Sequence, residues 1–257
     1  MKTWQKLAIL ILIPAAVLAI GIWRINVARS GEAVVVPQTN QEPTVTQDDT
    51  VMPRKLYIDS LQSARALVGK PIWIQAGYEL SYFPYASHRV DLAQNLGVLP
   101  SAQRLDIQDI VTQKVPAALA DRIAHGDKQA FVVFTMPGSD KQYATAVGFF
   151  QGTDSTWYCD TLFYYDDPHQ MYHFWSAKIW QAIDQHQPIA GMNELQTQMA
   201  VGVVEQSDSS EYGNRTVDYD AGPKHWQVTF ENDKATQVQQ QQPTPQPAQP
   251  QPAAPTS

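Results

Sequence analysis

Two histidines, His169 and His173, stand four residues apart in the stretch YYDDPHQMYHFW, just after Asp166 and Asp167. Two imidazoles one helical turn apart can ligate zinc, and a nearby carboxylate can complete the ligand set. Asp160 and Asp166 are the nearest acidic candidates for a third ligand. The stretch therefore raises the hypothesis of a metal-dependent or glycan-processing enzyme that uses His169 and His173.

The same stretch is also typical of a helix start. Asp167 is a preferred N-cap residue and Pro168 a preferred first helical residue. An apolar face follows at three- and four-residue steps, formed by Met171, Trp175, Ile179, Ala182 and Ile183. We therefore predict a helix over residues 168–186. Gln170 stands beside His169, where zinc proteases carry the glutamate that acts as general base, and this weighs against metal chemistry.

The sequence holds no nucleophile elbow, phosphate-binding glycine loop or dinucleotide fingerprint. We therefore predict no catalytic, cofactor-binding or metal-ligating residues and no cofactor. Cys159 is the single cysteine, so an internal disulfide is excluded and we expect its thiol to be buried. The net charge of −7, without a cluster of lysines and arginines, argues against a nucleic-acid partner.

The amino-terminal segment predicts a membrane location. An uncharged apolar run covers residues 7–23 and follows Lys2 and Lys6. Its length lies at the lower edge of what spans a bilayer as a helix. We interpret residues 1–30 as a single-pass anchor in a bacterial inner membrane, with the bulk of the chain in the periplasm. A cleaved secretory signal is the alternative, because Ala28, Arg29 and Ser30 form a small-x-small pattern.

Two stretches have the composition of disordered chain. Residues 31–54 mix prolines with polar residues, as linkers do. Residues 240–257 are rich in proline and glutamine and carry no charge, which is typical of an extended tail. The sequence between them is long enough for one large or two small folded domains.

Residues 55–184 indicate an aromatic-rich α+β domain. The expected elements are a short helix at 57–69, strands within 70–85, a helix in the second half of 108–126, a hairpin of 130–136 and 143–150 around PGSDK, and a third strand at 155–167. Strands that follow one another in sequence favour an antiparallel sheet. We expect the aromatic residues to form the core and its rim, although a stacking surface for sugars or peptides is an alternative.

Residues 185–239 indicate a second, smaller unit. Asn193 and Gln196 have the spacing of a capping box, and Gly202 can end the helix that they begin. A polar loop and three short antiparallel strands are expected after it. Trp226, Val228 and Phe230 alternate along one of these strands and should face the helix. We expect them to pack against the apolar face formed by Met192, Leu195 and Met199.

This second unit resembles the small SmpA/OmlA domain of outer-membrane assembly lipoproteins. The resemblance rests on Gly191, Met192, Gly202, Tyr219, Thr229, Phe230, Lys234 and Thr236, in IAGMNELQTQMAVG and in HWQVTFENDKATQV with the strand before it. The chain departs from the family pattern at Thr197, Val201 and Val203, and it lacks the lipid-bearing cysteine. The resemblance implies a helix-plus-sheet fold and a setting in the cell envelope.

Together these features predict a membrane-anchored periplasmic interaction or assembly protein without catalytic activity. Its expected partners are an envelope protein or a cell-wall component, together with the inner membrane that holds the amino-terminal helix. Recognition would use exposed strands, because a sheet edge can bind an extended segment through main-chain hydrogen bonds. The enzyme hypothesis based on His169 and His173 is the alternative, and a structural spacer is a third.

Mass spectrometry of the protein purified from membranes tests the anchor. Because the apolar run of residues 7–23 is longer than the core of most cleaved signals, we expect the amino-terminal residues to remain attached. A mature chain that begins at Gly31 would instead show that the segment is a cleaved signal.

Overall fold

The computed structural model describes residues 46–75, 77–116 and 126–241. The expected anchor at residues 1–30, the helix expected at 117–125 and the tail beyond residue 241 lie outside these ranges. Within them, no helix has the length and apolar character that a membrane span requires. The described residues from Gln47 onward belong to one compact unit.

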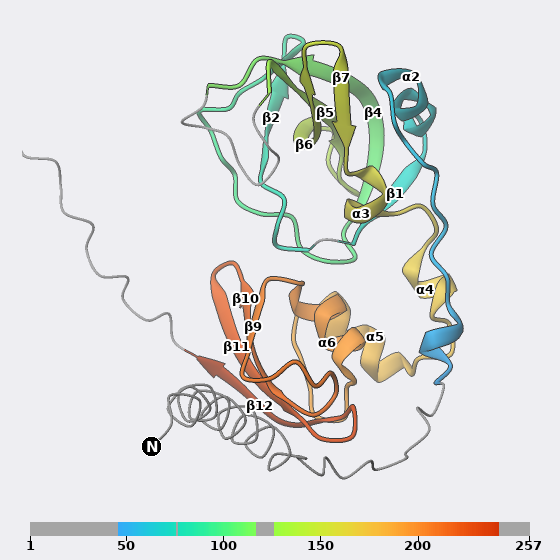
Figure 1. Ribbon diagram of the computed structural model, residues 1–257, viewed down its shortest axis with the longest axis vertical. Helices are drawn as coiled ribbons and strands as arrows, with labels where there is room; N and C mark the ends of the chain where they lie inside the picture. Colours follow the sequence, from blue (N-terminus) through green and yellow to red (C-terminus); the bar gives the residue numbers. More distant parts are fainter. Residues whose placement is uncertain (1–45, 76, 117–125, 242–257) are drawn as a thin grey trace, which may run out of the picture. The chain divides into compact units, whose positions relative to one another are not determined.

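The fold is α+β with two antiparallel sheets, as the sequence predicts (Figure 1). The first sheet has the order β3-β2-β6-β5-β4-β1-β8, with β7 paired to β6. Its strands are β1 (Pro71–Ile74), β2 (Tyr82–Ala86), β3 (Arg89–Val90), β4 (Arg104–Gln113), β5 (Lys128–Thr135), β6 (Tyr143–Gln151), β7 (Asp154–Trp157) and β8 (Phe163–Tyr164).

The β5–β6 hairpin confirms the clearest local prediction. Six consecutive residues of β5 are buried because the strand lies between β4 and β6 in the interior of the sheet. The expected third strand is correct only in its first part, since β7 pairs with β6 and then ends. The short helix α3 (Cys159–Leu162) follows, and the chain crosses to pair β8 with β1. Cys159 is buried, and burial raises the pKa of its thiol to about 12.

The first expected helix is present but short. It consists of α2 (Leu61–Ala64) and the 3-10 turn η2 (Arg65–Leu67). Ser60 and Ser63 form a reciprocal capping box at its start, and Gly69 adopts a positive φ of 77° just after it. Leu67 is buried against the first sheet, which orients the helix.

The predicted continuous helix over residues 168–186 is wrong, because the structure divides it. Its parts are α4 (Pro168–Met171) and α5 (Ala177–Asp184). Asp167 caps α4 as predicted, but Ser176 accepts a hydrogen bond from the Ile179 N–H and begins a new helix. Between them Tyr172 leaves helical geometry, and its ring stacks on Trp175 with centroids 4.4 Å apart. Burial of both rings favours the break over a continuous helix.

The second sheet has the order β12-β11-β10-β9 and therefore four strands, where the sequence predicts three. Its strands are β9 (Glu205–Ser207), β10 (Thr216–Ala221), β11 (Lys224–Phe230) and β12 (Ala235–Gln241). The missed strand, β9, is short, polar and mostly exposed, so it has no apolar alternation that would reveal it. Helix α6 (Glu194–Val201) has the predicted Asn193–Gln196 capping box and ends at Gly202, whose φ is 92°.

Two apolar cores organise the described residues. The first lies within the large sheet; the second lies between the small sheet and helices α5 and α6, which run side by side (Figure 1). Trp73 and Tyr164 from the first sheet, together with Tyr172, Trp175 and Trp180, belong to the second core. The expected boundary between residues 55–184 and 185–239 therefore does not coincide with the division between the two cores. Most of the aromatic side chains are buried, in agreement with their predicted core role.

The expected disordered linker at residues 31–54 also needs correction at its carboxyl end. Residues 48–50 form the 3-10 turn η1 (Asp48–Thr50), and Asp48 accepts a hydrogen bond of 2.6 Å from the Trp175 indole. Asp48 also accepts a hydrogen bond from the side-chain amide of Asn193. Polar composition suggests a linker, but Asp48 has partners that lie far away in the sequence.

Phe230→Ala tests the second core. Phe230 is 1% exposed in β11, on the same face as Trp226 and Val228. Removal of its ring leaves a cavity, and we expect the free energy of unfolding to fall by about 3–5 kcal/mol. Thr229→Ala is the control, because Thr229 points to the opposite face and is only partly buried. Chemical denaturation measures both; equal stability of the two variants would contradict the core assignment.

Candidate functional site

His169 has a carboxylate at each ring nitrogen and an aromatic ring stacked on one face. Its Nδ1 lies 3.2 Å from Asp167 Oδ1, and its Nε2 lies 3.2 Å from Asp184 Oδ1. The ring stacks on Trp180 with centroids 4.0 Å apart. Both ring nitrogens face carboxylate oxygens, whereas a metal ligand needs one nitrogen free. His169 therefore joins α4 to α5.

His173 lies in a different environment. Its Nδ1 is 3.1 Å from the Gln170 carbonyl oxygen, and its ring meets Phe174 edge-on. Across residues 46–75, 77–116 and 126–241, no group of three or more histidine, cysteine or acidic side chains is arranged to hold a metal ion. Asp160 and Asp166, the candidate third ligands, are engaged elsewhere. The residues that the enzyme hypothesis requires do not converge.

Asp160 instead anchors residues 47–59, which we call the strap. The backbone N–H of Leu56 donates to its carboxylate over 2.9 Å, and the N–H groups of Tyr57 and Ile58 also donate to it. Burial acts to raise the pKa of Asp160, but these hydrogen bonds outweigh it and hold the pKa below its usual value. Tyr57 has a φ of 53°, which turns successive N–H groups toward one anion.

Arg54, two residues before Leu56, is a second point at which the strap is held. Its Nε and Nη2 bond the two carboxylate oxygens of Asp166 at 3.1 and 2.8 Å, and Nη2 also donates to the Tyr165 carbonyl oxygen. This two-point contact holds the guanidinium in a defined plane. The strap therefore borders the space between itself and β1.

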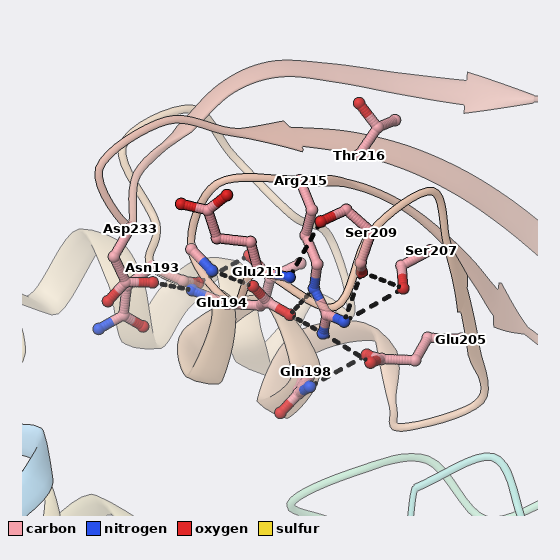
Figure 2. Close-up of polar contacts among 12 residues, drawn as sticks. Asn193, Glu194, Gln198, Glu205, Ser207, Ser209, Glu211, Arg215, Thr216 and Asp233 are labelled. Carbon is pink, nitrogen blue, oxygen red and sulfur yellow. Dashed lines mark hydrogen bonds and ion pairs between the residues drawn. The ribbon is translucent and has the colours of Figure 1, made fainter. Parts of the chain in front are cut away.

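A buried ion pair organises the second sheet and α6 (Figure 2). Glu194, at the first position of α6, is fully buried, and both Nε and Nη2 of Arg215 donate to its Oε1. The second carboxylate oxygen accepts the Gly213 N–H at 2.8 Å. Arg215 also reaches Glu205 in β9 at 2.9 Å. The hydrogen bond to Glu194 raises the pKa of Arg215 although burial opposes the shift.

This network has a structural role. It ties the loop that precedes β10 to the helix and to β9, and nearly all its donors and acceptors are paired with one another. Sequence reasoning missed it because Glu194 and Arg215 are separated by twenty-one positions without a connecting motif. The only signal was an acidic residue in the first turn of a helix, which is common.

The outer edge of β12 is one of the two edges of the small sheet. Among the residues that the structure describes, only Ala235 is bonded on that side, to the Gly191 N–H and the Met192 carbonyl oxygen. Phe230 N–H donates to Arg215 in the β10 direction, so alternation directs the backbone groups of Thr229 toward β12 and pairs them with Gln237. By the same alternation, the N–H and C=O groups of Val238 and Gln240 point away from β11.

The chain was compared with models of protein families, with curated proteins and with solved structures, and none of them matches it.

Arg215→Met tests the buried ion pair. The substitution leaves the Glu194 carboxylate buried without its cation, and we expect a loss of about 3–5 kcal/mol in the free energy of unfolding. Arg104→Met is the matched control, because Arg104 pairs with Asp106 at 2.8 Å but is 50% exposed. An exposed pair of this kind contributes about 0–1 kcal/mol. Similar losses for both variants in urea denaturation would contradict the structural role of the network.

Proposed function

We propose that this chain is a membrane-anchored interaction protein of the bacterial envelope, without catalytic activity, that binds a partner through the edge of β12. The observation that carries the proposal is that no described residue pairs with the outer edge of that strand beyond Ala235. Val238 and Gln240 direct backbone donors and acceptors outward, and β12 is the terminal strand of its sheet. Such an edge is a template for one more strand.

The composition of β12 supports this use. Proteins normally protect an edge with lysine, proline, a bulge or an inward-pointing charge. From Ala235 to Gln241 the strand has no charged residue and no proline, and its one register shift lies at the beginning, opposite Thr229 and Phe230. The remaining residues present an even, neutral edge. An extended segment of another envelope protein can pair with it without burying an unpaired charge.

The envelope setting is supported by sequence. The apolar run at residues 7–23 favours an inner-membrane anchor with the body in the periplasm. The resemblance of residues 185–239 to SmpA/OmlA domains favours the same compartment, and a cell-wall component remains an alternative partner class. The net charge of −7 favours neither nucleic acid nor an anionic surface as the main partner of the body.

The enzyme hypothesis receives no comparable support. The nitrogens of His169 face Asp167 and Asp184, and His173 contacts the Gln170 carbonyl group. No observation within the described residues brings the two histidines and a carboxylate into one cleft.

Gln240→Pro tests the edge. Proline removes the outward-facing N–H of residue 240 and leaves the β11-facing bonds of Gln239 and Gln241 intact. We expect affinity capture from solubilised envelope to lose the partner with Gln240→Pro and to retain it with Gln240→Thr, which keeps the N–H. Hydrogen exchange on the captured complex should show protection of the Val238 and Gln240 amides. Equal capture by both variants, or unprotected amides, would exclude β12 as the binding edge.

A further inference from the structure

A second binding surface lies where two strands of the first sheet separate. β1 and β8 are paired only through Trp73 with Tyr164 and Ile74 with Phe163. Toward its beginning β1 stays with β4, whereas the chain after Tyr164 turns away into α4. A cavity of about 480 Å³ opens between them, and the strap closes it on a third side. We call it the wedge pocket; its volume is within the usual range for small-ligand sites.

Three cationic side chains from separate segments line the wedge pocket. They are Arg54 of the strap, Lys70 before β1 and Arg104 of β4. Arg54 is held by Asp166, and Arg104 is held by Asp106 through Nε and Nη2. The side chains of both arginines are about half exposed, at 53% and 50%, and neither uses its Nη1 in a hydrogen bond within the described residues. Each is therefore a fixed donor with capacity left for a ligand.

One cation of the wedge pocket has no ion-pair partner within the described residues. Asp166 and Asp106 neutralise the two arginines, and Asp167 is engaged with His169 and with the start of α4. The exposed Lys70 side chain has no ion-pair partner within the described residues. One unpaired ammonium with fixed guanidinium donors nearby suits a monoanion better than a dianion, because a second negative charge would have no counterion.

The floor of the wedge pocket is apolar. It is formed by the buried side chains of Leu67, Ile72 and Trp73, with Leu56 of the strap beside them. A ligand that fills the space must therefore carry an apolar group next to its anionic group. Simple inorganic anions meet only half of this requirement.

We propose that the wedge pocket binds a small monocarboxylate with an apolar side chain, of the kind found at the carboxyl end of a peptide. Its carboxylate would lie between Lys70, Arg104 and Arg54, and its apolar group would rest on Ile72 and Trp73. This site does not involve β12 or the proposed strand addition.

Calorimetric titration of the full chain in detergent tests the site, with N-acetyl-leucine as the probe. N-acetyl-leucinamide tests the need for the charge, and orthophosphate tests the preference for a carboxylate. We expect the acid to bind and both other probes to bind at least about tenfold more weakly, since loss of one charge-assisted contact changes affinity by that amount. Absence of binding by the acid, equal binding of acid and amide, or tighter binding of phosphate would overturn the proposal.

Two variants locate the binding to the wedge pocket. Lys70→Gln should weaken binding of N-acetyl-leucine by at least about tenfold. Lys178→Gln is the control, because Lys178 is exposed on α5 outside the pocket, and it should change nothing. Leu56→Trp should fill the cavity and abolish binding with all three cations in place. Thermal denaturation checks that each variant is folded; unchanged affinity in folded Lys70→Gln and Leu56→Trp would place the ligand elsewhere.

Discussion

The carboxylate of Glu194 lies in the interior of the second core, where water cannot solvate it, and this constraint shapes the small sheet. A buried charge is tolerated only when it is paired and hydrogen-bonded. Arg215 and the Gly213 N–H meet the requirement, and Arg215 also forms an ion pair with Glu205 in β9. The ion pair thus sets the position of α6, of the loop before β10 and of the outermost strand β9. Without it, only apolar packing would hold α6 against the sheet that carries β12.

The strap extends the same principle to the first core. Its polar groups form hydrogen bonds and an ion pair with side chains outside the strap. Asp48 accepts a hydrogen bond from the Trp175 indole, and Arg54 pairs with Asp166. The Leu56 N–H donates to Asp160. These contacts involve both cores, because Trp175 belongs to the second and Leu56 packs against the first. The strap also forms one wall of the wedge pocket. A segment with linker composition therefore contributes both to stability and to a candidate binding surface.

The open hydrogen-bonding capacity of the described residues lies apart from their polar clusters. The polar clusters that the structure describes around Glu194, Asp160 and His169 are closed, since each charged group faces a partner within the protein. The open hydrogen-bonding capacity lies at the edge of β12 and at the rim of the wedge pocket. Both are surfaces that a peptide-like ligand can use through main-chain or carboxylate groups.

The sequence by itself determined the elements whose signals are local. The β5–β6 hairpin follows from two apolar runs around a Pro-Gly turn, and α6 follows from Asn193, Gln196 and Gly202. Burial of Phe230 follows from strand alternation.

Only the tertiary structure decided the features that join distant segments. Stacking of Tyr172 on Trp175 breaks the expected helix, and the ion pair of Glu194 with Arg215 recruits β9, which has no apolar pattern of its own. The candidate surfaces were still less predictable. The wedge pocket exists because β1 and β8 separate, and the β12 edge is free because no described strand follows it in the sheet. Neither condition is encoded in a local pattern, since both depend on which segments meet in space.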